Sequence, residues 1–159
     1  MNFRIAQLND LLILNTISVR SKRHWGYPEP WIERWMNELT LDEGKFYDQN
    51  ILIAEDKNQI IGFCSIVENT ENYEILHLWV LPEFIGKGHG KKLLERTIEA
   101  FVRKGKPIIA EADPNAEPFY RAQGFVTYDW VDSFPSGRFL PVMKKLLPAN
   151  DELNEQTEP

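Results

Sequence analysis

The chain has 159 residues, of which 43% are hydrophobic, and it carries a formal net charge of −6. This length is typical of one domain with a substantial core, and the acidic balance argues against nucleic acid as a partner. The single cysteine, Cys64, excludes an internal disulfide and is expected to be a small core residue. Three histidines show no metal-site spacing, and no apolar run approaches the roughly 18 residues of a membrane span. We therefore expect a cytoplasmic protein without a metal or membrane partner.

The N-terminal part predicts a short strand at residues 2–6 and two helices. Asp10 can cap the first helix, which should end near residues 20–24, and the second should start at Pro28 or Pro30. The inward face of each helix is predicted from 3.6-residue spacing. It comprises Leu11, Leu12, Leu14, Ile17 and Ser18 in the first helix, and Trp31, Ile32, Trp35, Met36 and Leu39 in the second.

The loop between these helices contains His24, Trp25 and Tyr27. These side chains can line a pocket, or they can pack as an aromatic corner. Residues 40–50 are predicted to be a polar connector. Three antiparallel strands follow, at residues 51–54, 60–67 and 73–80.

A glycine-rich turn connects the third of these strands to a helix that Lys91 and Lys92 open. Gly86, Gly88 and Gly90 leave a run of backbone N–H groups without side chains in front of them, which is typical of an anion site. Lys87 and His89 add charge near the positive end of the helix dipole, where cations are unfavourable unless an anion lies between them. A glycine turn with solvated lysines is the alternative. The inward face of the helix is predicted to comprise Leu93, Leu94, Thr97, Ile98, Phe101 and Val102.

Gly105 and Pro107 are expected to end this helix, and the strand at residues 107–112 should then pair in parallel with residues 73–80. Asn115 is a predicted N-cap, because Pro118 must lie in the first turn of the next helix. Strands are expected at residues 125–131 and 139–146, joined by the loop at 133–138. Residues 148–159 read as an acidic disordered tail, which leaves residues 1–147 as one domain.

These elements predict an α/β fold with a mixed sheet of the α+β kind. It has an antiparallel N-terminal half, a central β-α-β crossover and a C-terminal antiparallel pair, with helices on both faces. The spacing Gly-x-Gly-x-Gly excludes a doubly wound dinucleotide fold, and the missing Gly-Lys-Ser/Thr ending excludes a P-loop.

Two motifs in this order resemble the GNAT superfamily of acetyl-CoA-dependent N-acetyltransferases. One is Val80-x-Pro82 followed by the three glycines, and the other is Asn115-Ala116-x-x-Phe119-Tyr120-x-x-x-Gly124-Phe125. The resemblance covers about residues 3–147 and implies the GNAT acyltransferase fold, with acetyl-CoA as the acetyl donor. It also implies direct transfer to an amine in a ternary complex. Homodimers are common in the family, by analogy only.

The resemblance implies a set of cofactor-binding residues. These are Leu78, Trp79 and Val80 on the strand, Gly86, Lys87, Gly88, His89, Gly90 and Lys91 around the turn, and Asn115, Phe119 and Tyr120. Ile85 departs from the family pattern, which usually has Arg or Gln there. Because backbone N–H groups hold most of the phosphate contacts, we expect binding to survive this change.

Candidate catalytic residues follow from the same resemblance. Tyr120 matches the tyrosine beside the departing thiol, and we expect it to donate a hydrogen bond as charge develops on sulfur. An amine of pKa about 10.4 has to lose a proton before it reacts. Glu74 matches the base of the histone-acetylating branch, His77 has a suitable unperturbed pKa of about 6.5, and water is the third option.

The acceptor is expected to be the primary amine of a small molecule. The resemblance implies that the loop with His24, Trp25 and Tyr27 borders it, together with the loop at residues 133–138. The alternative function is a CoA-binding sensor or regulatory module without turnover. Tyr120 beside intact glycines favours the enzyme, and Ile85 favours the module.

Overall fold

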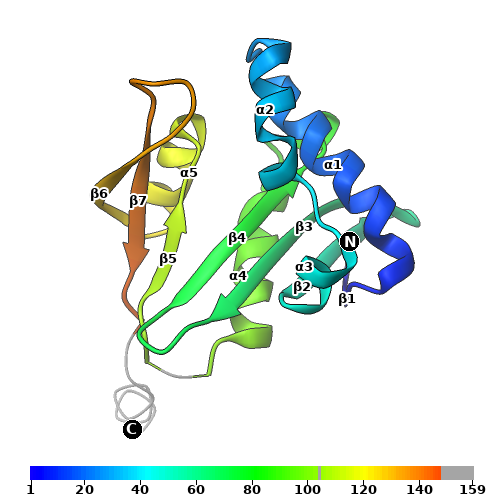
Figure 1. Ribbon diagram of the computed structural model, residues 1–159. Helices are drawn as coiled ribbons and strands as arrows, with labels where there is room; N and C mark the ends of the chain where they lie inside the picture. Colours follow the sequence, from blue (N-terminus) through cyan, green and yellow to red (C-terminus); the bar gives the residue numbers. More distant parts are fainter. Residues whose placement is uncertain (104, 148–159) are drawn as a thin grey trace, which may run out of the picture.

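The computed structural model describes residues 1–103 and 105–147. A seven-stranded sheet runs in the order β1-β2-β3-β4-β5-β7-β6, with helices on both faces (Figure 1). Only the pair of β4 and β5 is parallel among the paired strands of these residues. This arrangement confirms the predicted antiparallel first half, central crossover and final antiparallel pair.

The strands are β1 (Asn2–Ile5), β2 (Asn50–Asp56), β3 (Gln59–Glu68), β4 (Tyr73–Val80), β5 (Ile108–Glu111), β6 (Val126–Asp132) and β7 (Phe139–Lys145). The helices are α1 (Leu11–His24), α2 (Glu29–Leu39), α3 (Glu43–Tyr47), α4 (His89–Phe101) and α5 (Glu117–Ala122). Short 3-10 helices are η1 (Leu8–Asp10), η2 (Pro82–Phe84) and η3 (Pro114–Ala116).

The sheet separates two apolar layers that hold the central strands in place. On the side of α4 and α5, Tyr73 and Ile108 pack with Leu93 of α4, and Cys64 is fully buried among them, as predicted. On the side of α1 and α3, Leu14 and Phe63 belong to a second layer. Burial on both faces fits the nearly continuous apolar sequence of β3 and β4, and it makes these strands a rigid base for a site.

The predicted polar connector at residues 40–50 is wrong in part, because it contains α3. The Asp42 carboxylate accepts a hydrogen bond from the Lys45 backbone N–H at 2.8 Å, which caps this short helix. Phe46, only 7% exposed, anchors the helix on the sheet. One apolar side chain and one cap therefore suffice for a single turn that periodicity does not reveal.

Three further expectations about helices are wrong. Leu12, expected to point inward, is 78% exposed, because the buried stripe of α1 follows Leu14 and Ile17 instead. Helix α4 begins at His89 rather than Lys91, and it ends at Phe101, with Val102 already extended. Its helical run thus stops before Gly105.

The N-cap at the start of the last helical segment is Asp113, not Asn115. The Asp113 carboxylate accepts from the Asn115 backbone N–H at 2.8 Å, and Asn115 lies inside η3. Its side chain is then free to donate elsewhere. The predicted acidic tail at residues 148–159 lies outside the described residues, and the division at residue 147 stays a prediction.

Candidate active site

The parallel strands β4 and β5 pair over only part of their length. Their register ends at Ile75 and Ala110, although β4 continues to Val80. The register with β3 skips Leu76, which marks a β-bulge at the same point. Because a bulge bends its strand, the two strands diverge beyond it (Figure 1). A cavity of about 540 Å³ opens between their C-terminal ends.

The divergence leaves backbone groups of β4 facing this cavity. The Ser21 hydroxyl of α1 donates to the Val80 carbonyl at 2.8 Å, on the side of β4 that faces away from β3. Alternate residues of a strand direct their backbone groups to the same side, so those of Leu78 also face away from β3. Leu78, Trp79 and Val80 all line the cavity. An extended chain could therefore hydrogen-bond to β4 where β5 no longer does.

The glycine turn closes one end of the cavity. Gly86 and Gly88 have φ angles of +80° and +81°, which only glycine adopts without strain. Gly90 has an ordinary helical conformation, and a Cβ there would lie 3.5 Å from the Phe119 ring. The backbone conformation thus requires glycine at positions 86 and 88. At position 90 neither the conformation nor the available space requires it.

Positive groups gather where α4 begins. Its first turn contains Lys91 and no acidic residue, and its first N–H groups have no partner within the helix. Gly86, Gly88, Gly90 and Lys91 line the cavity, as do Asn115, Phe119 and Tyr120. Lys87 and His89 do not: the Lys87 ammonium lies over the Phe84 ring, and His89 Nδ1 lies 3.1 Å from Met1 Sδ. The turn therefore fits a polyanion, held by N–H groups and the helix dipole.

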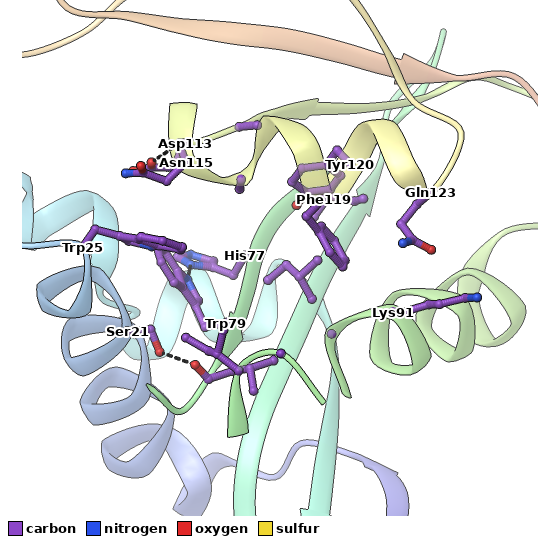
Figure 2. A pocket seen from close by; sticks show the side chains of 18 of the residues that line it. Ser21, Trp25, His77, Trp79, Lys91, Asp113, Asn115, Phe119, Tyr120 and Gln123 are labelled. Carbon is purple, nitrogen blue, oxygen red and sulfur yellow. Dashed lines mark hydrogen bonds between the residues drawn. The ribbon is translucent and has the colours of Figure 1, made fainter. Parts of the chain in front are cut away.

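Tyr120 of α5 lines the cavity on the wall across from Trp79 of β4 (Figure 2). The residue is 6% exposed, and its ring packs edge-on against Phe119 and Phe125. Burial raises the pKa of Tyr120 well above its usual value, so the hydroxyl stays protonated at neutral pH. No described residue forms a hydrogen bond with this hydroxyl, which leaves it available as a donor to a bound group.

His77 lies near the other end of the cavity, beside Trp79 (Figure 2). Burial, followed by the charge of Lys45, lowers the pKa of His77 to about 4. The imidazole is therefore neutral at pH 7, and its Nδ1 accepts from the Trp79 indole N–H at 3.0 Å. This bond places the remaining proton on Nε2, so His77 is arranged as a donor rather than as a base.

The other predicted base, Glu74, does not line the cavity. It lies two residues before Leu76, where the bulge occurs, and it pairs with Ile109 of β5. Glu111, at the end of β5, does line the cavity, although no sequence motif pointed to it. Burial, followed by the charges of Glu74 and Glu38, raises the pKa of Glu111. The available signal was its position near the end of the strand at residues 107–112, which was predicted to be parallel to β4.

A buried polar cluster closes the end of the cavity opposite the glycine turn. The Lys22 ammonium lies 2.6 Å from the Asp113 carboxylate, and Tyr27 donates its hydroxyl to the same carboxylate at 2.9 Å. Arg138 lies 3.3 Å from Asp113, and the Asn115 amide donates to the Tyr27 hydroxyl at 2.9 Å. This cluster joins α1, the end of β5, η3 and the β6–β7 loop, and sequence reasoning found neither Lys22 nor Asp113.

Of the predicted acceptor loop, only Trp25 lines the cavity. His24 packs its ring edge-on against Trp25, at 5.3 Å between centroids. The Tyr27 ring packs against Trp35, and its hydroxyl belongs to the polar cluster. The loop thus lines the cavity through Trp25 and packs as an aromatic corner through Tyr27, so each predicted alternative holds for part of it.

Two further observations concern residues 1–103 and 105–147. Within these ranges no group of three or more His, Cys, Asp or Glu side chains is arranged to hold a metal ion. No helix in the same ranges has the length and apolar character that a membrane crossing requires.

The diverging parallel strands, the glycine turn and the cavity between them define an acyl-CoA N-acyltransferase fold. Residues 47–127 match the family model of the acetyltransferase (GNAT) domain. The chain belongs to the GNAT acetyltransferase family. This confirms the predicted class of enzyme, an acetyltransferase.

Three similar proteins illustrate this relationship. An uncharacterized N-acetyltransferase from Archaeoglobus fulgidus is 31% identical over 84 residues, which cover 46% of this chain and 57% of that protein. The matched region therefore spans little more than half of this curated relative. The PaiA N-acetyltransferase from Thermoplasma acidophilum, crystallised with coenzyme A, is 25% identical with a TM-score of 0.70, over 92% of this chain and 100% of that one. A ribosomal-protein-alanine N-acetyltransferase from Brucella melitensis is 26% identical with a TM-score of 0.67, over 92% and 100%.

Proposed function

We propose that this protein transfers the acetyl group of acetyl-CoA to a primary amine. The observation that carries this proposal is that one continuous cavity runs from the glycine turn, along the unpaired edge of β4, to Tyr120. When bound, acetyl-CoA supplies a thioester-activated acetyl group. The bound coenzyme A of the Thermoplasma relative supports this choice of donor.

The residues of the turn and of β4 fit the two ends of such a donor. Backbone N–H groups of Gly86–Gly90 and the start of α4 would hold the pyrophosphate, with Lys91 adding positive charge. The backbone groups of Leu78 and Val80 would bind the extended pantetheine arm. Because Ser21 already occupies the Val80 carbonyl, the Leu78 carbonyl and the N–H groups of both residues are the expected partners.

Tyr120 would donate its hydroxyl hydrogen to the departing sulfur. Its raised pKa makes full proton transfer to a thiolate unfavourable, so its contribution is a hydrogen bond that strengthens as negative charge develops. A non-catalytic CoA sensor would not need a donor at this place. Tyr120 therefore favours the enzyme over the sensor module.

The acceptor that we propose is the amine of a small molecule. The name of the Brucella relative indicates a second candidate, the terminal amine of a protein that begins with alanine. A cytoplasmic location and a homodimer stay predictions.

Calorimetry with acetyl-CoA and a thiol-release assay over a panel of amines test the function. We expect the cofactor to bind with micromolar affinity and at least one amine to release thiol in step with amide. No binding at millimolar cofactor would overturn both the enzyme and the sensor, whereas binding without turnover on any amine or alanine-initiated peptide would favour the sensor.

A further inference from the structure

A second, smaller cavity of about 140 Å³ adjoins the first. Both cavities are lined by Leu76 and His77 at the β4 bulge, by Trp79, by Glu111 at the end of β5, and by Asp113 just after it. The smaller one continues between these strand ends toward α1, α2 and the β6–β7 loop. It therefore opens onto the point where the donor cavity meets His77, rather than onto the glycine turn.

The charges around this smaller cavity do not cancel. Its two cations, Lys22 and Arg138, both contact the carboxylate of Asp113. Glu38 and Glu111 also line it, and neither forms a salt bridge within the described residues, although the charge of Glu38 also acts on Lys22. Two cations thus face three carboxylates, and both cations form their ion pairs with the same one, Asp113. The unpaired carboxylates give the cavity a negative rim.

The environment of Glu111 disfavours its negative charge. Burial raises the pKa of its carboxyl first, and then the charges of Glu74 on β4 and Glu38 on α2 raise it further. The nearby Lys22 and Arg138 face Asp113 and do not reverse this shift. A ligand that brings a positive charge between Glu38 and Glu111 would relieve the repulsion.

The remaining walls carry apolar surface and neutral donors. Leu39, Leu140 and the Trp79 ring are apolar, and the His77 imidazole is neutral. Trp35, only 4% exposed, also lines the cavity, and its indole N–H has no partner among the described residues. At about 140 Å³ the space is well below the roughly 300 Å³ and more of sites for drug-sized ligands. It suits a compact group with a short carbon stem.

We propose that the smaller cavity is the acceptor subsite, that Glu38 and Glu111 select a compact amine that arrives as a cation, and that Glu111 accepts the proton that this amine must lose. The inference rests on the proposed acetyl transfer and names the substrate class and the base for it. In the proposed step the ammonium loses one proton and the Glu111 carboxylate gains it. The nitrogen keeps the electron pair of that N–H bond, which it needs to form the amide.

Glu111 suits this step better than the two bases expected from sequence. Glu74 lies outside both cavities, and the lone pair of His77 Nδ1 is already bonded to Trp79. Glu111 lines both cavities, so it lies where donor and acceptor would meet. Glu111 is also exposed to solvent, so the proton can pass on to water.

Binding of butylamine, with 1-butanol as the uncharged analogue, tests the selection of a cation. Indole N–H signals of the wild-type protein saturated with coenzyme A report binding by NMR at pH 7.5. We expect butylamine to bind and 1-butanol to bind at least fivefold more weakly, and E38Q and E111Q each to weaken butylamine binding about fivefold. E33Q, on the exposed side of α2 and outside both cavities, is the matched control and should bind like wild type. Equal binding by all four proteins, or no butylamine binding to wild type, overturns the proposal.

Kinetics with amines of different basicity test the proton acceptor. With butylamine, E111Q should lose about 100-fold or more in kcat/KM, whereas E38Q should raise KM with little change in kcat. With 2,2,2-trifluoroethylamine, whose ammonium is already deprotonated at neutral pH, the loss in E111Q should shrink to less than about tenfold. An equal loss with both amines would mean that Glu111 has a structural role only and would overturn its assignment as the base.

These results separate the two proposals. If wild type and E111Q bind coenzyme A equally and wild type acetylates other amines but not butylamine, the function stands and the subsite assignment fails. If no amine is acetylated, the function itself fails.

Discussion

The Lys22 ammonium and the Asp113 carboxylate lie 2.6 Å apart, and both side chains are only 9% exposed. Burial opposes the ionisation of Asp113. The charge and hydrogen bond of Lys22, with hydrogen bonds from Asn115 and Tyr27, outweigh burial and hold the pKa of Asp113 below its usual range. The pair joins α1 to the segment that follows β5, beside the cavity between the diverging strands.

Breaking this pair should be costly. Lys22→Met leaves the Asp113 charge buried with only the more distant Arg138, so we expect the free energy of unfolding to fall by about 2–4 kcal/mol. Urea unfolding measures the loss. Arg20→Gln, which removes an exposed ion pair to Glu83, is the control and should cost less than about 1 kcal/mol. Equal costs for the two variants would contradict the structural importance of the buried pair.

His77 should make the protein less stable in mild acid. Its pKa is about 4 when folded and about 6.5 when unfolded, so between these values the unfolded chain binds the extra proton. Stability is therefore lost as the pH falls below 6.5, by about 2 kcal/mol between pH 7.5 and pH 5. Urea unfolding of wild type and His77→Gln at both pH values checks this. The same pH dependence in the variant would contradict the assignment to His77.

The glycines of the turn should differ in their tolerance of alanine. Gly86→Ala and Gly88→Ala force a left-handed backbone on an L-residue, which costs about 1–2 kcal/mol each and distorts the N–H cradle. Calorimetry should show coenzyme A binding at least tenfold more weakly. Gly90→Ala, with 3.5 Å to its nearest neighbour and no positive φ, should bind normally. Loss of binding only in Gly90→Ala would refute this ranking.

Ile85 lines the cavity and is 39% exposed beside Gly86. Ile85→Arg would add a cation next to the proposed pyrophosphate site. We expect coenzyme A to bind three- to tenfold more tightly, for about 1 kcal/mol gained at an exposed position. Ile5→Arg on β1, 64% exposed, should leave affinity unchanged. Equal affinities in wild type and Ile85→Arg would show that this side chain does not reach the phosphates.

Local patterns predicted the part of the fold that surrounds the cofactor site. The strand at residues 73–80, the glycine turn and the parallel return of β5 follow from a nearly continuous apolar run, the glycine spacing and the crossover connection. Leu12 was wrongly placed inward because periodicity alone does not decide which side of a helix meets the sheet, and α3 was missed because a single turn is too short to show a period.

The acceptor side was harder to predict for a physical reason. Lys22 and Asp113 are 91 residues apart in the chain, and their pairing depends on how α1 packs against the end of β5. In the sequence Glu111 looks like any other strand residue. Only the divergence of β4 and β5 in the structure places it beside a cavity. Ion pairs and cavities between distant segments leave no periodic signal in one sequence.

Tyr120→Phe tests the proposed contribution of the hydroxyl to turnover. Because the hydroxyl has no partner in the described structure, its loss should change the free energy of unfolding by less than about 1 kcal/mol. The kcat should fall about 10- to 100-fold while coenzyme A affinity stays unchanged. Unchanged thiol release would remove the proposed function of this residue.

The most direct measurement follows an isotope-labelled acetyl group from acetyl-CoA into product by mass spectrometry. The acceptors would be an amine panel that includes butylamine and an alanine-initiated peptide. We predict a labelled amide, with one molecule of CoA thiol released for each amide formed. A labelled cofactor that binds but yields no amide with any acceptor would contradict the assignment as an N-acetyltransferase.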